Sequence, residues 1–187
     1  HAIDPFAQEA SVLTTFSGAV QGIALGRDGT LYITHGNQLA AIDPLTGDEA
    51  WSATTELFSL TPPVVGPNGR IFVGASGEVE GQAYAFSSAG NELWSVPTTG
   101  LIDAAPAVGA DGTVYVGVDE GANSQLLALD PSGGTPRWTF PTGARLDHPP
   151  ALTADGTVYL ASAGGLFSIV GPQIGMPASP VDVERVE

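Results

Sequence analysis

The chain is patterned in short segments in which apolar residues alternate with polar or small ones, separated by glycine-containing turns. Thr30-Leu-Tyr-Ile33 and Thr113-Val-Tyr-Val116 are typical: each follows an Asp-Gly pair directly and carries β-branched and aromatic residues. An Asp-Gly or Asn-Gly pair supplies the positive φ that a tight hairpin requires. No segment of ten or more residues combines helical periodicity with capping residues. The pattern therefore predicts an all-β protein of many short strands.

The alternating segments belong to an internal repeat. One eight-residue motif occurs four times, at residues 26–33, 66–73, 109–116 and 153–160. Its Asp or Asn recurs at spacings of 40, 43 and 44 residues. A second motif follows the first three copies and ends in a tryptophan, at Trp51, Trp94 and Trp138. A short apolar piece also precedes each hairpin from the second copy onward, so one period contains four short strands.

A period of about 40 to 45 residues with four strands is typical of a β-propeller blade. The segment Ala41 to Trp51 reads Ala-x-Asp-x-x-Thr-Gly-x-x-x-Trp and resembles the tryptophan-docking motif of the PQQ-type β-propeller repeat. The resemblance covers residues 19–172 and implies a propeller of four-stranded antiparallel blades, about four of them in this chain. It also implies that one set of residues packs between blades without carrying chemistry: Trp51, Trp94, Trp138, Gly47 and Gly90.

The two ends of the chain fit the repeat incompletely. Residues 1–172 are assigned to the repeats and residues 173–187 to a C-terminal linker or tail. Residues 1–5 repeat the end of a third strand, residues 10–16 stand where an outer strand would come, and the last copy has no clear fourth strand. We therefore expect the N-terminal strand to complete the last blade, which would remove a free edge. Three assemblies stay open: a closed four-bladed ring, an eight-bladed ring from two chains, or part of a longer polypeptide.

Charge narrows the range of partners. The chain carries 20 acidic residues, five Arg and no Lys, for a formal net charge of -15. Such a surface repels phosphate backbones and anionic lipid headgroups, which argues against nucleic-acid and membrane-surface partners and favours basic ones. The sequence has no cysteine, and no window approaches the roughly 20 apolar residues of a membrane-spanning helix.

Few residues offer catalytic or metal-binding chemistry. His35 and His148 are interpreted as hydrogen-bonded residues at strand edges; Asp147 precedes His148, but adjacent residues on a strand point to opposite faces, so we expect no shared proton. The Asp-Gly aspartates are interpreted as turn residues: Asp28, Asp111 and Asp155. The candidate Ca²⁺ ligands are Glu78, Glu80, Asp119 and Glu120, near Asn123 and Ser124, with solvated loop charge as the favoured interpretation.

The function expected from this sequence is a non-catalytic scaffold or protein-binding subunit of a cell-envelope or extracellular complex, with no catalytic residue and no cofactor. The periplasmic, cell-surface or extracellular location follows from the family resemblance. Two alternatives are kept. The chain is part of a larger PQQ-dependent enzyme or sugar-binding propeller whose site lies outside these residues, or it is a structural subunit of a polymer. A protein partner is expected, and self-association is left open.

Overall fold

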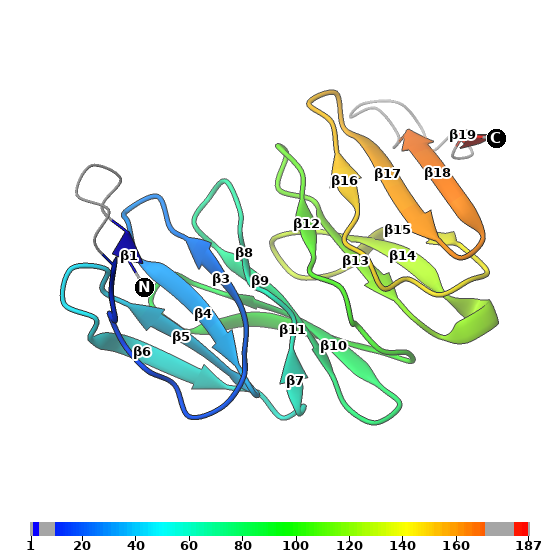
Figure 1. Ribbon diagram of the computed structural model, residues 1–187. Helices are drawn as coiled ribbons and strands as arrows, with labels where there is room; N and C mark the ends of the chain where they lie inside the picture. Colours follow the sequence, from blue (N-terminus) through cyan, green and yellow to red (C-terminus); the bar gives the residue numbers. More distant parts are fainter. Residues whose placement is uncertain (1, 4–9, 171–181, 187) are drawn as a thin grey trace.

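The computed structural model describes residues 2–3, 10–170 and 182–186, with side chains described for residues 12–170. Four antiparallel sheets follow one another along the chain and form an arc (Figure 1). The first sheet has the order β3 (Val20–Leu25), β4 (Leu31–His35), β5 (Gln38–Ile42) and β6 (Glu49–Thr54). The third has the order β12 (Ala107–Val108), β13 (Val114–Val118), β14 (Gln125–Leu129) and β15 (Pro136–Pro141).

The second sheet differs only at its inner edge. Two short strands, β7 (Ser59–Leu60) and β8 (Val64–Val65), both pair with β9 (Ile71–Ser76), which is followed by β10 (Gly81–Phe86) and β11 (Glu92–Thr98). The one helix among the described residues is a single 3₁₀ turn, Gly121–Asn123. The expected all-β propeller of four-stranded antiparallel blades is therefore confirmed.

The fourth sheet corrects one expectation. Its order is β16 (Ala151–Leu152), β17 (Thr157–Ser162), β18 (Gly165–Val170) and β19 (Asp182–Val186). The outer strand therefore comes from the segment assigned to a tail, whereas the N-terminal β1 (Ala2–Ile3) pairs with β2 (Ala10–Ser11). A strand is plausible in the tail because valines alternate with acidic residues over Val181 to Glu184.

The turn between the first two strands of each sheet is built the same way four times. A side-chain oxygen accepts a hydrogen bond from the backbone N–H two residues on, at 2.9–3.3 Å, in each of Asp28, Asn68, Asp111 and Asp155. This local bond is the turn chemistry that Asp and Asn favour. These aspartate and asparagine side chains therefore hold the hairpins in shape.

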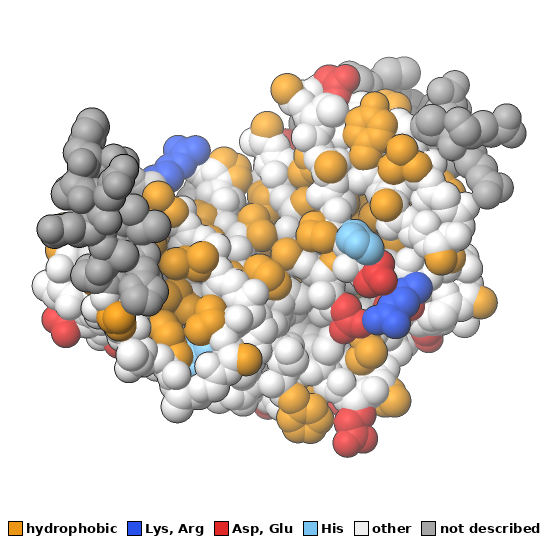
Figure 2. Space-filling model, viewed as in Figure 1, with side chains coloured by type: hydrophobic (Ala, Val, Ile, Leu, Met, Phe, Trp, Pro, Cys, Tyr) orange, Lys and Arg blue, Asp and Glu red, His pale blue; other side chains and the backbone are white. Residues whose placement is uncertain are grey.

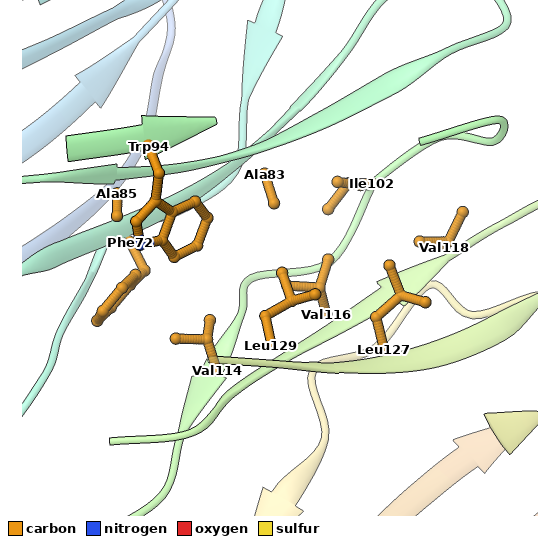
Figure 3. Packing of buried hydrophobic residues seen from close by; sticks show 10 residues of the cluster. All are labelled: Phe72, Ala83, Ala85, Trp94, Ile102, Val114, Val116, Val118, Leu127 and Leu129. Atoms are coloured by element: carbon orange, nitrogen blue, oxygen red, sulfur yellow. The ribbon is translucent and has the colours of Figure 1, made fainter. Parts of the chain in front are cut away.

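The hydrophobic core is divided among the junctions between consecutive sheets. One cluster joins sheets one and two, another joins sheets two and three, and a third joins sheets three and four. At the middle junction, Phe72, Ala83 and Trp94 of the second sheet face Val114, Val116 and Leu129 of the third (Figure 3). Inner strands also meet in chain order, β3 with β8, β8 with β12 and β12 with β16. Consecutive sheets therefore bury the faces that they turn toward each other.

The first and last sheets lie at opposite ends of the arc, and the surface between them is hollowed (Figures 1 and 2). On the two middle strands of the first sheet, Ile33, Ala40 and Ile42 form a small fourth cluster with Phe16 and Leu31. The chain segment before β3 thus covers part of the face that would otherwise meet a preceding sheet.

Candidate protein-interaction surface

The first junction is anchored by Trp51 at the end of the first sheet. Its indole Nε1–H donates to the carbonyl of Ser88, in the turn between β10 and β11, at 3.0 Å. Gly90 in the same turn has φ +83°, and a Cβ placed there would lie 2.7 Å from Cδ2 of the indole. The turn can approach the ring this closely because Gly90 has no side chain.

The second junction repeats this contact one sheet later. The Nε1–H of Trp94 donates to the carbonyl of Pro131 at 2.9 Å, and the indole lies 5.9 Å from the Phe72 ring. Gly134, with φ +71°, takes the place of Gly90, because a Cβ there would lie 2.8 Å from Cε3 of Trp94. Sequence reasoning singled out Gly47 and Gly90 but missed Gly134. The sequence does contain a signal for Gly134, because it lies four residues before Trp138, as Gly47 lies four residues before Trp51.

The other two expected docking residues lie at the ends of the series. Trp138 packs in the third junction with its ring 5.7 Å from that of Tyr115. At the first two junctions, the carbonyl that accepts the indole hydrogen bond lies 37 residues after the tryptophan. The corresponding position for Trp138 lies outside the described residues. Gly47, with φ +79°, faces the backbone of Leu13, whose oxygen would lie 2.2 Å from an added Cβ. Gly47 is therefore a close-approach position too, but its neighbour is the N-terminal segment.

The connections between sheets lie along one face of the arc, at the same end of the strands in each sheet. We call this end of the strands the loop rim, formed by residues 55–58, 77–80, 99–104, 119–124 and 142–148. In a four-stranded antiparallel sheet, the loop between the second and third strands and the link to the next sheet lie at the same end. Backbone bonds join them: Leu101 and Asp119 exchange N–H···O bonds of 3.0 and 2.8 Å, and Thr142 N donates to Ser124 O at 2.9 Å.

Side chains extend these links from sheet to sheet. Ser76 Oγ, at the end of β9, accepts from Ile102 N and donates to Ile102 O, both at 3.0 Å. Thr99 Oγ1 donates to Glu120 at 3.1 Å. The loops of the second and third sheets are thus tied to one another.

Arg145 is the cation at the centre of this end. Its Nε lies 3.2 Å from a carboxylate oxygen of Asp119, and its Nη2 lies 3.3 Å from one of Asp103. Asp147 is a further neighbour, at 3.9 Å. Asp147 lies in the same link as Arg145, so the guanidinium joins this β15–β16 link to the β11–β12 link through Asp103 and to the β13–β14 loop through Asp119. Figure 2 shows acidic and basic side chains gathered here beside a histidine.

That histidine corrects an expectation. His148 Nδ1 lies 2.6 Å from Asp147 Oδ1, although neighbouring residues were expected to point apart. The reason is that both residues belong to the link between β15 and β16, where strand alternation does not apply. The hydrogen bond from His148 lowers the pKa of Asp147 below its ordinary value. His35 ends β4 and stacks on Phe16, with 4.7 Å between ring centroids.

The candidate Ca²⁺ ligands lie in two loops and are already engaged in part. Asp119 is held by Arg145 and Ser124, and Glu120 accepts from Thr99. Glu78 and Glu80 lie in the β9–β10 loop. Within the described part of the chain, no three His, Asp or Glu side chains are grouped so that they could hold a metal ion.

The charge of the loop rim is strongly one-sided. Seven carboxylates stand against Arg145: Glu56, Glu78, Glu80, Asp103, Asp119, Glu120 and Asp147. Two open hollows lie elsewhere, one of about 300 Å³ between Leu25, Arg27 and Val65, the other of about 200 Å³ beside His35 and Gln38. No helix among the described residues is long and apolar enough to cross a membrane.

Comparisons with solved structures show the same fold at low sequence identity. BamB from Moraxella catarrhalis superposes with a TM-score of 0.65 at 22% identity, over 81% of this chain and 50% of that one. A protein of unknown function from Bacteroides caccae gives 0.61 at 15%, over 81% and 56%. The quinohemoprotein alcohol dehydrogenase ADHIIG from Pseudomonas putida HK5 gives 0.62 at 19%, over 75% and 31%. The chain thus spans about half the length of the first two structures and less of the third.

The sequence comparisons agree with the repeat. No curated protein matches the chain. The sequence model of the family described as "Outer membrane protein assembly factor BamB" matches twice, over residues 8–100 and 79–172. This confirms the resemblance to PQQ-type propeller repeats that the tryptophan motif indicated. The chain belongs to the family of the outer membrane protein assembly factor BamB.

Proposed function

We propose that this chain is a non-catalytic scaffold of the cell envelope that binds a partner protein at its loop rim. The observation that carries the proposal is the contact of Arg145 with Asp103 and Asp119, which ties the β15–β16 link to two other connections of the rim. The family description, an outer membrane assembly factor, supports an envelope location and a role in assembly.

The loops of the rim are held in place by internal hydrogen bonds and ion pairs, which favours the binding of another protein because less conformational entropy is lost. Ordering a loop during association costs free energy, roughly 0.5–1.5 kcal/mol for each side chain immobilised. The bonds of Ser76, Thr99 and Arg145 hold the rim before the partner arrives. Loops on a rigid framework are also where repeat folds carry their specificity.

The charge of the rim defines the chemistry of the partner. Seven carboxylates around one arginine attract a surface that carries lysine or arginine, and they speed its approach. Binding should therefore weaken as salt is added. A quinone-dependent enzyme is the competing function, suggested by the likeness to a quinohemoprotein alcohol dehydrogenase.

Site-specific photo-crosslinking tests the proposal. A photoreactive residue is placed at Phe58 or Val79, exposed residues of the rim, and at Ala89 or Ala154 in exposed turns at the opposite end of the strands. The chain is exported to the periplasm of a Gram-negative host. We expect the same adduct from both rim positions and none from the turn positions.

Two arginine variants sharpen the test. Arg145→Ala should weaken the adduct, because it frees three loops of the rim. Arg137→Ala is the matched control, since this arginine also bridges two aspartates, Asp111 and Asp130, but at the turn end. Equal adducts from both ends, no adduct from either rim position, or an absorbance band of bound PQQ in the presence of Ca²⁺ would each overturn the proposal.

A further inference from the structure

Two large apolar side chains are exposed on the loop rim at the junction of the first and second sheets. Phe58, in the link between β6 and β7, is 69% exposed, and Val79, in the β9–β10 loop, is 75% exposed. Single exposed apolar side chains are common on protein surfaces, but contiguous ones mark interaction sites. Both sheets of this junction are described, and neither covers these two side chains.

The link and the loop that carry them lie side by side. Because β7 pairs antiparallel with β9, the residues that come next at the rim, Phe58 and Gly77, are adjacent. The N–H of Gly77 donates to the carbonyl of Glu80 at 2.8 Å, which closes a tight loop around Val79. Leu57 reaches this loop, since a Cβ added to Gly77 would lie 3.3 Å from its Cδ2. We call Phe58 and Val79 together the apolar patch.

The link that carries Phe58 is held on both sides of this residue. The N–H and the hydroxyl of Thr55 both donate to the carbonyl of Asn37, at 2.9 and 3.2 Å, and Asn37 Nδ2 donates to the carbonyl of Thr55 at 3.0 Å. Leu57 packs against the core of the first junction, and Leu60 is buried in it. The exposed ring therefore stands on a fixed loop, which reduces the entropy lost when a partner covers it.

The equivalent position in the other two links shows that the fold does not require an aromatic residue here. The repeat spacing of 43 and 44 residues places Leu101 and Arg145 where Phe58 stands. Arg145 holds neighbouring loops through its charge, and Leu101 exchanges backbone hydrogen bonds with Asp119. The ring of Phe58 is instead turned to solvent, so its side chain is available for binding.

The apolar patch is surrounded by negative charge that has no counter-charge. Glu56, Glu78 and Glu80 are exposed and lie within two residues of Phe58 or Val79 in the sequence. In the part of the chain that the structure describes, none of these three glutamates forms an ion pair. Figure 2 shows apolar side chains beside acidic ones at the lower edge of the view, where Figure 1 places β7 and the β9–β10 loop.

We propose that the apolar patch is the main contact point of the loop rim, and that the partner segment bound there carries an aromatic or aliphatic side chain flanked by lysine or arginine. This inference rests on the proposed function, because it assumes that a protein binds at the rim. A few central apolar residues dominate the affinity of most protein interfaces, and charges around them select the partner. The same three carboxylates repel an anionic membrane surface.

Photo-crosslinking in the periplasm of a Gram-negative host tests the apolar part. The photoreactive residue is placed at the exposed Ser59, which leaves the apolar patch intact. Phe58→Ser combined with Val79→Ser should lower the yield of the partner adduct at least about tenfold, while Phe58→Trp should preserve it. The matched control is Leu45→Ser with Leu93→Ser, two exposed leucines away from the rim, and it should leave the yield unchanged.

A charge variant tests the flanking carboxylates without altering the apolar patch. Replacing all three glutamates by glutamine should lower the adduct yield at least about threefold. Its control replaces three exposed carboxylates that lie outside the rim, in the substitutions Asp48→Asn, Glu49→Gln and Glu92→Gln. All replaced side chains are exposed, so every variant should keep the Tm of the parent chain, which circular dichroism checks.

Tandem mass spectrometry of the adduct then identifies the partner segment. We expect an apolar residue flanked by lysine or arginine. A segment without basic residues, or an adduct that survives loss of the apolar patch at full yield, would overturn this inference and leave the proposed function standing, because a protein would still bind at the rim. No protein adduct from Ser59, Phe58 or Val79 would overturn both.

Discussion

The close approach of Gly90 to Trp51 gives the sharpest test of how the sheets are joined. Replacing Gly90 with Ala should destabilise the fold in two ways, through backbone strain at positive φ and through a clash with the indole. A second glycine, Gly69, allows the two effects to be measured separately. Gly69 lies in the same sheet with φ +76°, but an added Cβ there would meet nothing within 4 Å. At Gly90, with φ +83°, the added Cβ would lie 2.7 Å from the indole. Gly69→Ala therefore measures the backbone cost alone, and Gly90→Ala measures that cost plus the clash.

The two costs can be estimated separately. A left-handed conformation costs an L-residue roughly 1–2 kcal/mol, which is the whole effect expected for Gly69→Ala. Forcing a methyl group into a packed contact adds about 1–3 kcal/mol. For a chain of this size, 1 kcal/mol corresponds to about 2–4 °C in Tm. Gly90→Ala should therefore lower Tm by at least about 2 °C more than Gly69→Ala does.

Thermal unfolding followed by tryptophan fluorescence and circular dichroism supplies the measurement. A Trp51→Ala background removes the indole, so Gly90→Ala should there cost no more than Gly69→Ala. The cycle thus isolates the contact, with an expected coupling of about 1–3 kcal/mol. Equal losses for the two glycine variants in the wild-type background would refute the proposed docking role of Gly90 and Trp51.

Two further predictions concern the second and third sheets. In chemical denaturation, Trp94→Phe should lower the free energy of unfolding by only about 1 kcal/mol, because Pro131 O keeps a second donor in Arg70. Trp94→Ala should lower it by about 3–5 kcal/mol, because it also empties the packed site. Equal losses for the two variants would contradict this prediction. Burial alone would raise the pKa of Asp111, but hydrogen bonds from Thr113 and the charge of Arg137 outweigh it and hold the pKa below its ordinary value. This stabilisation is present above the unfolded-state pKa of about 3.9 and is lost as pH falls through the folded value. Asp111→Asn should therefore lose less Tm than the wild type between pH 7 and pH 3, and an unchanged difference would refute the link.

The sequence predicts the fold well because the repeat makes each local signal occur several times. A single Asp-Gly pair is a weak hairpin signal, but four turns at spacings of 40 to 44 residues leave few alternatives. The turn bonds at Asp28 and Asp111 are local, so a short segment contains all the information they need. Gly134 could have been found by the same argument, from its place four residues before Trp138.

Contacts between distant segments were harder to predict. The contact of Arg145 with Asp103 joins residues 42 apart, which is about one repeat period, but the position equivalent to Arg145 one repeat earlier is Leu101, so the repeat does not predict an ion pair there. The Asp147–His148 contact was missed because a strand was assumed where the chain forms a link. The partner of β18 was misassigned because β19 lies beyond a stretch with no repeat signal.

The exposure of Tyr159 cannot be predicted from the sequence of its own repeat. Its segment, Thr157-Val-Tyr-Leu160, has the same pattern as Thr113-Val-Tyr-Val116, and that pattern indicates a strand buried on both faces. Whether it is buried depends on a neighbouring sheet, because each sheet of a repeat fold contacts only the sheets beside it. Tyr159 is exposed because, within the described residues, no further sheet packs against its face.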